Sequence, residues 1–515
     1  MLSNTLRAQT RCRTRSSRLA PIFRTVSSSA KSVYVLPIDP SSPKSATGAP
    51  VDAAQLWQSA PTGKKPAKAG TSRLFYGENN AAVVSLGEGF DKKKDGARRE
   101  VVRKAVGSAV KAVKGLGDEE LKVVVDASAD AHASAVAAHL AKYKFTLKTD
   151  PPSSFRPGAT DAPAENLSFG PLEASKEWDE GMLYAEAQNF ARTLQEMPAN
   201  MMTPTAFCER VQAEFGNIPG VSIVVRDEEW AKEKGMNLFL SVSRGTDEPA
   251  KFLEIHYNGA SQEAQPVAFV GKGVTFDTGG ISIKPSANMK LMRGDMGGAA
   301  TVVGATLAIA KLKLPVNLIT VCPLTENMPG PSATKPGDIV YGMNGKSVEI
   351  DNTDAEGRLI LADALTYATT EFKPHTVIDA ATLTGAMVVA LGEVYTGTYT
   401  NSDGLWDELR TAGETEYDRF WRMPLDGEYL QQITATNADL MNAGSRSAGS
   451  VTAAMFLKHF VEGVEGKDGN EPSVRWAHLD IAGTMESSTG SPYQEKGMTG
   501  RPVRALIEWA KRLGQ

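Results

Sequence analysis

Cysteine and histidine are scarce in this chain of 515 residues. Its three cysteines, Cys12, Cys208 and Cys322, show no paired spacing, and its six histidines form no HExxH pattern. A disulfide framework, a cysteine-based zinc site and a HExxH zinc site are therefore all disfavoured. Any metal site in this chain must be built mostly from carboxylates.

Long apolar runs are also missing from the sequence. None approaches the roughly 18 to 20 residues that a membrane span requires, so no membrane partner is expected. The composition, 41% hydrophobic and 23% charged, is ordinary for a globular protein. The length allows two or three domains.

Acidic residues are absent from the first 31 positions, which hold six arginines, one lysine and many serines. This composition is typical of a mitochondrial transit peptide and lacks the apolar centre of a secretory signal. We therefore predict a transit peptide over residues 1–32 and a location in the mitochondrial matrix. The alternative is a disordered basic tail on a cytoplasmic protein. Because the whole chain carries a net charge of −4 and this segment contributes seven positive charges, the remainder carries −11. An acidic body argues against nucleic-acid binding.

Strand-like and helix-like segments alternate in the first part of the body. We expect strands at 33–38, 81–86 and 121–125, and helices at 97–116 and 131–143. This alternation predicts an α/β domain with a mainly parallel sheet over residues 33–176. His132 and His139 are expected on a solvent-facing side of their helix. The proline- and serine-rich stretch 150–170 is expected to be a loop.

A long helix over residues 177–198, which Pro198 ends, is predicted to link this domain to a larger one over 199–515. The larger domain again alternates, with helices at 297–312, 358–372 and 451–461. Its expected strands are at 221–225, 238–242, 252–257, 267–270, 318–322, 347–350, 376–378 and 476–481. The predicted fold class is α/β, with two doubly wound domains.

The stretch Asn352-Thr353-Asp354-Ala355-Glu356-Gly357-Arg358-Leu359 places two carboxylates two residues apart at a strand-to-helix junction. Ligands collect at such junctions in α/β folds. If the segment is extended, Asp354 and Glu356 project to the same side, where a divalent cation would relieve their repulsion. The alternative interpretation is a capped helix N-terminus, because Asn, Thr and Asp cap helices and an early Glu suits the macrodipole.

A second cluster is rich in glycine and carries Lys272, Asp277, Lys284 and Asp295 after an apolar strand. The alternative, an anion cradle, is weakened because the GxxxxGK[ST] spacing is absent. Four carboxylates from the two clusters would balance two divalent cations, and a neutral lysine could join them as a ligand. Paired metals activate water and polarise a carbonyl, so peptide hydrolysis is one chemistry that this set suits. The remaining cations, Lys284 and Arg358, would suit its anionic intermediate.

These motifs resemble those of the leucyl (cytosol) aminopeptidase family of dinuclear metallopeptidases. The resemblance covers residues 190–510, whereas the N-terminal half is similar only in its α/β pattern and the leader has no counterpart in typical cytosolic members. Gly444-Ser445-Arg446 departs from the more usual Gly-Gly-Arg, which puts only a local turn in doubt. Further matching segments are Pro198-Ala199-Asn200, Ala380-Ala381-Thr382-Leu383-Thr384-Gly385, Trp421-Arg422-Met423-Pro424, Trp476-Ala477-His478-Leu479-Asp480-Ile481-Ala482-Gly483 and Gly500-Arg501-Pro502-Val503-Arg504.

The resemblance implies a role for each matching residue. Two divalent metals (zinc or manganese, with magnesium or cobalt as alternatives) would be held by Lys272, Asp277, Asp295, Asp354 and Glu356, with Asp277 and Glu356 bridging them. Lys284 would contact the scissile carbonyl oxygen, and Arg358 would hold a bicarbonate that acts as general base. The substrate would contact Lys272, Asp277, Lys284 and Asp295, and its first side chain would lie among Met292, Asn352, Thr382, Gly385, Ala482 and Met485.

Several of these residues also have a purely structural interpretation. Met292 and Met485 could be core fillers, and Thr382 and Thr384 turn hydroxyls. His478, in a strand-like run, is expected to be a buried structural histidine.

The family resemblance implies a metal-dependent aminopeptidase that removes leucine and other bulky apolar residues from short peptides, as a homohexamer. Three alternatives remain open at this point: a non-enzymatic member, a DNA-binding accessory role, and a dipeptidase that acts on Cys-Gly.

Overall fold

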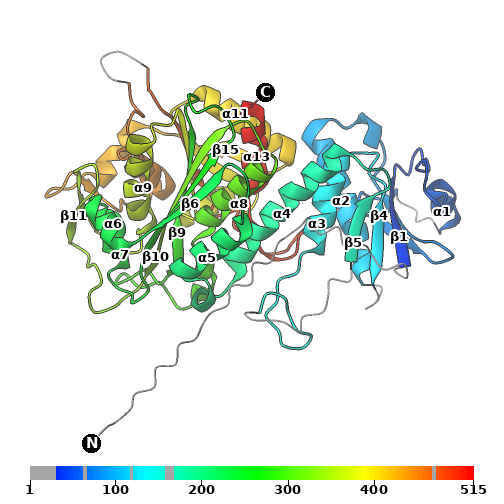
Figure 1. The fold of residues 1–515 in the computed structure, drawn as a ribbon, viewed down its shortest axis with the longest axis horizontal. Helices are drawn as coiled ribbons and strands as arrows, with labels where there is room; N and C mark the ends of the chain where they lie inside the picture. The colour runs from blue at the N-terminus through cyan, green and yellow to red at the C-terminus, as the bar shows by residue number, and fades with distance from the viewer. Residues whose placement is uncertain (1–30, 62–65, 116–119, 157–166, 467–470, 515) are drawn as a thin grey trace, which may run out of the picture.

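The computed structural model describes residues 31–61, 66–115, 120–156, 167–466 and 471–514, which form two α/β units (Figure 1). Helix α4, Lys176–Glu196, extends from one unit to the other and packs against helices of both. The predicted linker helix is therefore present. The predicted transit segment lies outside the described residues, except for Lys31 and Ser32, which begin the first strand.

The N-terminal unit is a five-stranded sheet in the order β2-β3-β1-β4-β5. Strand β2 is antiparallel to its neighbour and the other strands are parallel. The strands are β1 Lys31–Ile38, β2 Ser72–Phe75, β3 Asn80–Ser85, β4 Leu121–Val125 and β5 Leu167–Pro171. The helices are α1 Ala53–Ser59, the short η1 Phe90–Lys92, α2 Asp95–Lys114 and α3 Ala131–Lys142.

The C-terminal unit contains a nine-stranded sheet in the order β15-β14-β17-β13-β8-β10-β7-β6, with β9 also paired to β10. Its strands are β6 Val221–Arg226, β7 Lys251–Asn258, β8 Val267–Gly271, β9 Gly273–Asp277, β10 Asn317–Asn327, β13 Thr376–Ala381, β14 Thr396–Thr400, β15 Phe420–Arg422 and β17 Arg475–Asp480. The centre is parallel, whereas β7 runs antiparallel to β6 and β10, and β14 runs antiparallel to β17 and parallel to β15. Small sheets are formed by β11 Ile339–Tyr341, β12 Ser347–Glu349 and β16 Leu440–Met441, and by β18 Glu486–Ser487 and β19 Gly497–Met498.

Helices cover both faces of this large sheet. The central strand β8 is buried throughout, and its alternate side chains enter two different cores. Phe269 packs in the core with α8 and α13, whereas Ala268 and Val270 pack in the core with α7, α9 and α12. The helices are α5 Pro204–Phe215, α6 Glu228–Glu233, α7 Asn237–Ser243, α8 Gly297–Lys311, α9 Gly357–Glu371, α10 Gly385–Leu391, α11 Asp403–Glu416, α12 Gly449–Lys458 and α13 Val503–Leu513, with short turns η2 Ala199–Met201, η3 Met289–Gly294 and η4 Gly427–Ile433.

One predicted strand, at 238–242, is wrong, because these residues form helix α7. The carboxylate of Asp363 accepts a hydrogen bond from the amide of Phe239 at 2.9 Å, which satisfies a donor in the first turn of the helix. The hydroxyl of Ser241 donates to the carbonyl of Leu238 at 2.7 Å within the same turn. Short apolar runs do not distinguish strand from helix, and here the tertiary contact from α9 decides between them.

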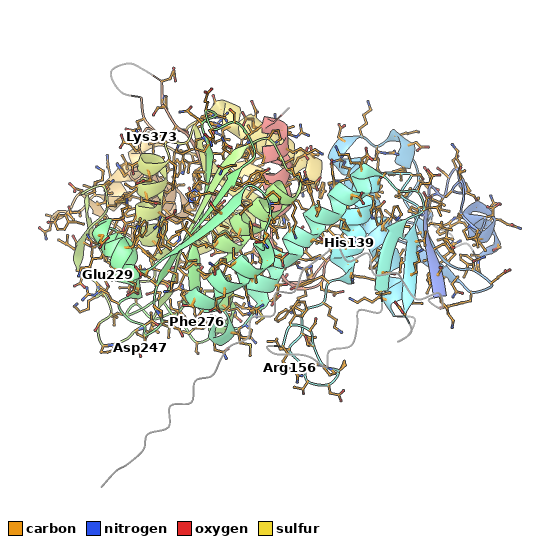
Figure 2. The ribbon with its side chains drawn as sticks, viewed as in Figure 1. His139, Arg156, Glu229, Asp247, Phe276 and Lys373 are labelled. Atoms are coloured by element: carbon orange, nitrogen blue, oxygen red, sulfur yellow. The ribbon has the colours of Figure 1, made fainter. Side chains whose placement is uncertain are left out.

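The prediction that His132 and His139 face solvent is also wrong. Helix α3 is packed against both α2 and α4, so most of its circumference is buried. His139, labelled in Figure 2, lies against the rings of Phe169 and Trp178, and burial lowers its pKa to about 4. Of the predicted loop 150–170, residues 157–166 lie outside the described residues and 167–170 belong to β5.

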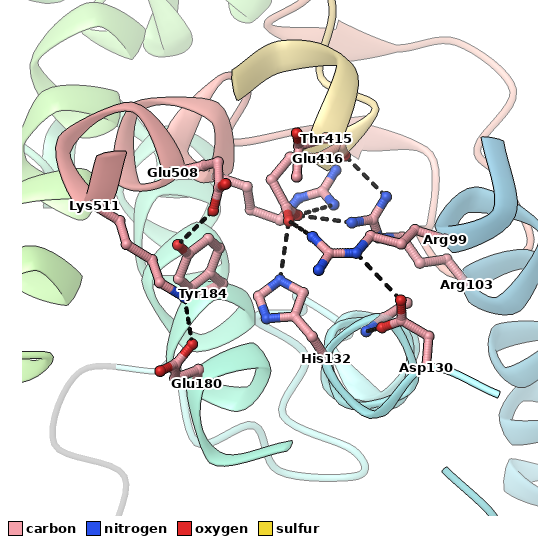
Figure 3. A network of polar contacts seen from close by, with 12 residues as sticks. Arg99, Arg103, Asp130, His132, Glu180, Tyr184, Thr415, Glu416, Glu508 and Lys511 are labelled. Atoms are coloured by element: carbon pink, nitrogen blue, oxygen red, sulfur yellow. Dashed lines mark hydrogen bonds and ion pairs between the residues drawn. The ribbon is translucent and has the colours of Figure 1, made fainter. Parts of the chain in front are cut away.

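The two units are joined by a buried ionic cluster around Glu416, at the end of α11 (Figure 3). Its carboxylate accepts hydrogen bonds from Arg103 of α2 at 2.8 Å and from Arg504 of α13 at 3.3 Å, and lies 3.0 Å from the ring nitrogen of His132. Burial alone would raise the pKa of Glu416, but Arg103 and His132 hold it well below its usual range. The cluster therefore connects helices of the N-terminal unit to α11 and α13 of the C-terminal unit through paired charges.

The cysteines Cys208 and Cys322 are buried free thiols. Among the described residues, each helix is too short or too polar to cross a lipid bilayer.

Candidate metal centre

The predicted site residues gather near the carboxyl ends of the parallel strands β8, β9, β13 and β17 and at the start of α9. Asp277 is the last residue of β9, and Lys272 follows β8 directly. Oxygen atoms of Asp277, Asp354 and Glu356 all lie within 4.8 Å of one another. The fold thus brings the two sequence clusters together at one edge of the sheet, where α/β folds bind ligands.

The segment that carries Asp354 and Glu356 is a tight turn rather than the extended segment that the sequence suggested. The side chain of Asn352 accepts a hydrogen bond from the amide of Asp354 at 2.9 Å, and the carbonyl of Asn352 accepts one from Ala355 at 3.1 Å. The two carboxylates face one another across this turn, so the expected convergence is confirmed but its structural basis is different.

The capping alternative is wrong. Glu356 itself is the N-cap residue of α9, and its side chain makes no capping hydrogen bond. Its Oε2 atom is buried and finds no hydrogen-bond partner in the described part of the chain, and its Oε1 atom lies 2.8 Å from the amine of Lys272. A buried carboxylate oxygen without a donor is costly unless a cation is available to it.

Lys272 is buried beneath the carboxylates and is 3% exposed. Its Nζ atom lies 2.8 Å from Asp295 Oδ2 and donates a hydrogen bond of 3.1 Å to the carbonyl of Thr382. Burial lowers the pKa of Lys272, but the charges of Asp295 and Glu356 outweigh it and raise that pKa above its usual value. A neutral amine ligand at this position would therefore need metal cations in place of the proton.

Gly357 provides the space for this lysine. A Cβ atom at position 357 would lie 2.6 Å from Cε and 2.7 Å from Nζ of Lys272. The first residue of α9 must therefore be glycine for the amine to reach both Asp295 and Glu356.

Lys284 closes the other side of the cluster. Its Nζ atom lies 2.7 Å from Asp277 Oδ2 and also pairs with Asp354. The second oxygen of Asp277 accepts hydrogen bonds of 2.8 Å from the amide of Gly279 and from the side chain of Asn327. Burial raises the pKa of Asp277, and the nearby Glu356 adds to this effect. Burial opposes a charge on Lys284, but Asp277 and Glu356 raise its pKa above the usual value.

Arg358 lies in the first turn of α9 and is buried. Its Nη1 atom donates a hydrogen bond of 2.6 Å to the carbonyl of Asn442, whereas Nε has no partner. Burial lowers the pKa of Arg358 to about 10, so the guanidinium remains charged at neutral pH. Arg358 and Lys284 line the same cleft of about 260 Å³, which therefore presents two cations to an anionic ligand.

The residues predicted for the substrate pocket fall into two groups. Asn352 and Gly385 line this cleft. The other four lie on segments around Asp295 or at the end of β17 and are not among the described residues that line it: Met292, Thr382, Ala482 and Met485. The Thr382 hydroxyl donates to Asp295 Oδ1 at 2.7 Å, so Thr382 acts on a predicted metal ligand rather than within its own turn.

Met292 and Met485 approach the same segment. The amide of Asp295 donates to the carbonyl of Met292 at 3.2 Å, and the Met485 side chain packs against Gly294. The amide of Ala482 donates to Asp480 at 3.2 Å.

His478 is confirmed as a buried structural histidine. Its Nδ1 atom lies 2.5 Å from Asp379 Oδ1, and its ring stacks near Trp476 and Tyr399. Ser445, the departure from the family pattern, donates a hydrogen bond of 2.7 Å to Gln432 and lines the cleft.

Two asparagines that the sequence did not single out hold the site together. Asn327 donates to Asp277 and to the carbonyl of Thr353, and Asn442 bonds to the turn between 351 and 355. The only available signal was position, because Asn327 ends an apolar strand whose neighbour ends at Asp277. A single asparagine without a motif does not reveal such a role.

The donor set fits divalent cations. Carboxylate oxygens are the ligands that magnesium, manganese and zinc accept, and the cluster is buried at the end of a rigid sheet. When ionised, Asp277, Asp295, Asp354 and Glu356 together carry four negative charges, which would balance two such cations, and the buried Glu356 Oε2 has no hydrogen-bond partner among the described residues. The arrangement therefore suits a metal-dependent hydrolytic site.

Comparison with known proteins gives a consistent result. The catalytic-domain model of the cytosol aminopeptidase family matches residues 189–507. The cytosol aminopeptidase of Dictyostelium discoideum is 48% identical over 84% of this chain and 82% of that protein. The human cytosol aminopeptidase is 47% identical over 87% of this chain and 85% of that protein. A solved structure, the bottromycin maturation enzyme BotP in complex with Mn, is 31% identical with a TM-score of 0.77, and the match covers 94% of this chain and 100% of BotP.

Proposed function

Because the chain belongs to the cytosol aminopeptidase family and is a metal-dependent aminopeptidase, we propose that it releases leucine and other bulky apolar residues from the N-termini of short peptides by a two-metal mechanism. The observation that carries this proposal is the convergence of Asp277, Asp354 and Glu356 within 4.8 Å, beside a buried and unpartnered Glu356 oxygen.

Five residues would hold the two cations: Lys272, Asp277, Asp295, Asp354 and Glu356. Zinc and manganese are the proposed metals, with magnesium and cobalt as alternatives. When bound, such cations activate water and polarise the scissile carbonyl. The relative that is solved in complex with Mn supports a divalent metal here.

The remaining residues of the site act on the peptide. Lys284 donates a hydrogen bond to the carbonyl oxygen and stabilises the negative charge that develops there. Its raised pKa keeps it charged in the presence of neighbouring carboxylates. Asp295 receives the free α-amine of the substrate, which restricts cleavage to the first residue.

Arg358 is proposed to hold a bicarbonate ion in the cleft. Its planar guanidinium offers the paired donors that a carboxylate-like anion requires, and Nε has no partner among the residues that the structure describes. A bicarbonate held there would supply the general base, so the site would need no histidine for this role.

The preference for leucine is supported by the side chains around Asp295. The Met485 side chain packs against Gly294, next to the residue that would bind the α-amine, and flexible thioethers accommodate branched apolar groups. Asn352 and Gly385 form the adjoining wall of the cleft.

A homohexamer is proposed as the working assembly. Large apolar side chains are exposed along and near α10, including Val389 at 89% and Trp421 at 55%. A neighbouring subunit would cover them, since exposed apolar patches mark interaction sites. Sedimentation of the purified protein tests this, and a monomer at micromolar concentration would refute it.

The proposed location is the mitochondrial matrix, on the basis of the acid-free basic leader. Residues 1–40 fused to a fluorescent reporter should direct it to mitochondria. A diffuse cytosolic signal would refute this part of the proposal.

Hydrolysis of leucine p-nitroanilide by the purified full-length protein tests the activity. We expect chelation to abolish hydrolysis, added Mn²⁺ or Zn²⁺ to restore it, and Glu356→Gln to remain inactive with metal present. Glu371→Gln is the matched control, because Glu371 ends the same helix and only pairs with the part-exposed Lys234 at 3.3 Å. Metal-independent hydrolysis, or full activity of Glu356→Gln, would overturn the proposal.

A further inference from the structure

Asn442 is a fully buried side chain that bonds to four main-chain groups of the segment carrying Asp354. Its Oδ1 atom accepts hydrogen bonds from the amides of Asp351 at 2.9 Å and Asn352 at 3.2 Å. Its Nδ2 atom donates to the carbonyls of Asn352 at 2.7 Å and Ala355 at 3.3 Å. Both donors and both acceptor sites of the amide are therefore used, and all four partners lie in residues 351–355.

The main chain of Asn442 extends this connection in two directions. Its amide donates to the carbonyl of Glu349 at 3.0 Å, at the end of the strand that leads into the turn. Its carbonyl accepts the hydrogen bond of 2.6 Å from Arg358, on the helix that follows the turn. One residue thus contacts the strand, the turn and the helix on which two carboxylates and the guanidinium are placed.

The turn needs such a brace for a physical reason. Residues 351–356 form neither helix nor strand, so their main-chain groups have no regular hydrogen-bond partners. The segment also carries Asp354 and Glu356, whose charges repel one another when they are held close together. Without the amide of Asn442, the turn could relax by separating the two carboxylates, and Arg358 would lose its fixed orientation.

We propose that Asn442 is a positioning residue that presets the metal-binding turn and the anion-binding arginine together. This inference rests on the proposed two-metal function and assigns the arrangement of the site to a residue that touches neither metal nor substrate. Outer residues that orient ligands typically change metal affinity or activity by 10- to 100-fold when they are replaced.

A matched control exists in the same unit. Asn401 also uses its amide to brace main chain, since it donates to the carbonyls of Val464 at 2.9 Å and Val474 at 3.0 Å and accepts from Trp476 at 2.8 Å. It lies beside the start of β17, whereas the metal-binding residues lie at the carboxyl ends of the strands. Replacing it should cost stability without changing the site.

The test compares Asn442→Asp with Asn401→Asp in the full-length protein. Aspartate keeps the shape and the oxygen that accepts both hydrogen bonds, but replaces the NH2 group and its two donors by one oxygen that faces two carbonyls. Titration of the metal-stripped protein with Mn²⁺, thermal unfolding, and kcat and KM for leucine p-nitroanilide are measured for both. If Asn442→Asp does not fold, Asn442→Ser, which keeps one hydroxyl donor, provides the same comparison.

We expect the Asn442 variant to bind Mn²⁺ roughly 10- to 100-fold more weakly and to lose kcat at saturating metal. The Asn401 variant should lower the unfolding temperature while its Mn²⁺ affinity stays within about twofold of wild type. Wild-type Mn²⁺ affinity and kcat in the Asn442 variant would overturn the inference and leave a purely structural role. A wild-type protein that binds no divalent metal would instead refute the proposed function, and this inference with it.

Discussion

Replacing Gly357 by alanine would place a methyl group where the end of the Lys272 side chain lies. The added Cβ would be 2.6 Å from Cε and 2.8 Å from Cδ of Lys272. Carbon atoms in contact are normally about 3.5 to 4.0 Å apart, so the lysine would have to withdraw by about 1 Å. Its amine would then lose the 2.8 Å contacts to both Asp295 and Glu356.

Two opposing effects set the size of the change. Breaking a buried ion pair costs about 3 to 5 kcal/mol, whereas alanine in place of glycine in a helix returns up to about 1 kcal/mol. We therefore expect Gly357→Ala to reduce the free energy of unfolding by roughly 2 to 4 kcal/mol. A displacement of 1 Å at a reacting site lowers activity by about 100-fold, and kcat/KM should fall accordingly.

Urea unfolding and hydrolysis of leucine p-nitroanilide measure both effects. Gly404→Ala is the control, since Gly404 lies in the first turn of α11 and a Cβ there would meet nothing nearer than Ser402 Oγ at 3.9 Å. The control should be as stable as wild type or more so, with unchanged activity. Wild-type stability and kcat/KM in Gly357→Ala would show that the space at this glycine is not needed by the Lys272 side chain.

Three further predictions concern buried ionisable side chains. Burial lowers the pKa of His139 to about 4, so the unfolded chain binds a proton more readily than the folded one, and the free energy of unfolding should fall by about 3 kcal/mol between pH 6.5 and pH 4. In urea unfolding measured over this pH range, His139→Gln should show a smaller fall than wild type. An equal fall in the variant would contradict the lowered pKa of His139. Glu416→Gln should reduce the free energy of unfolding, measured with urea, by about 3 to 5 kcal/mol because Arg103 and Arg504 lose their counter-charge. Arg99 lies at the part-exposed edge of the cluster, so Arg99→Gln should reduce it by less than about 1 kcal/mol. Arg358→Lys keeps the charge but loses the planar fork, so kcat should fall by about 100-fold while Mn²⁺ titration stays unchanged; a kcat close to wild type would argue against an anion held there.

The convergence of Asp354 and Glu356 could be predicted from the sequence because it is local. The two carboxylates lie two residues apart, so they come close together whether the segment is extended or turned. Asn442 could not be predicted in the same way, because its role depends on main-chain atoms about 90 positions earlier in the chain. An asparagine carries no sign of such a role until the fold brings the two segments together.

Among the helices and strands, those set by local sequence could also be predicted, whereas those set by distant contacts could not. The central strands were predictable because they are apolar on both faces and bounded by glycine or proline. Residues 238–242 have an equally apolar pattern, but a carboxylate on α9 stabilises the helical turn there. His132 was misplaced because the sequence of one helix does not reveal that two other helices, and a glutamate about 280 residues later, surround it.

The ionic cluster between the two units also has a consequence for how the protein is made. Arg103 and Glu416 are 313 residues apart, and Arg504 arrives later still. At a synthesis rate of about 5 to 20 residues per second, Glu416 is synthesised roughly 15 to 60 seconds after Arg103 and His132. During that time the surface that will become the junction must stay hydrated, since a buried charge without a partner is unfavourable. The junction between the two units can therefore form only after α11 and α13 have been synthesised.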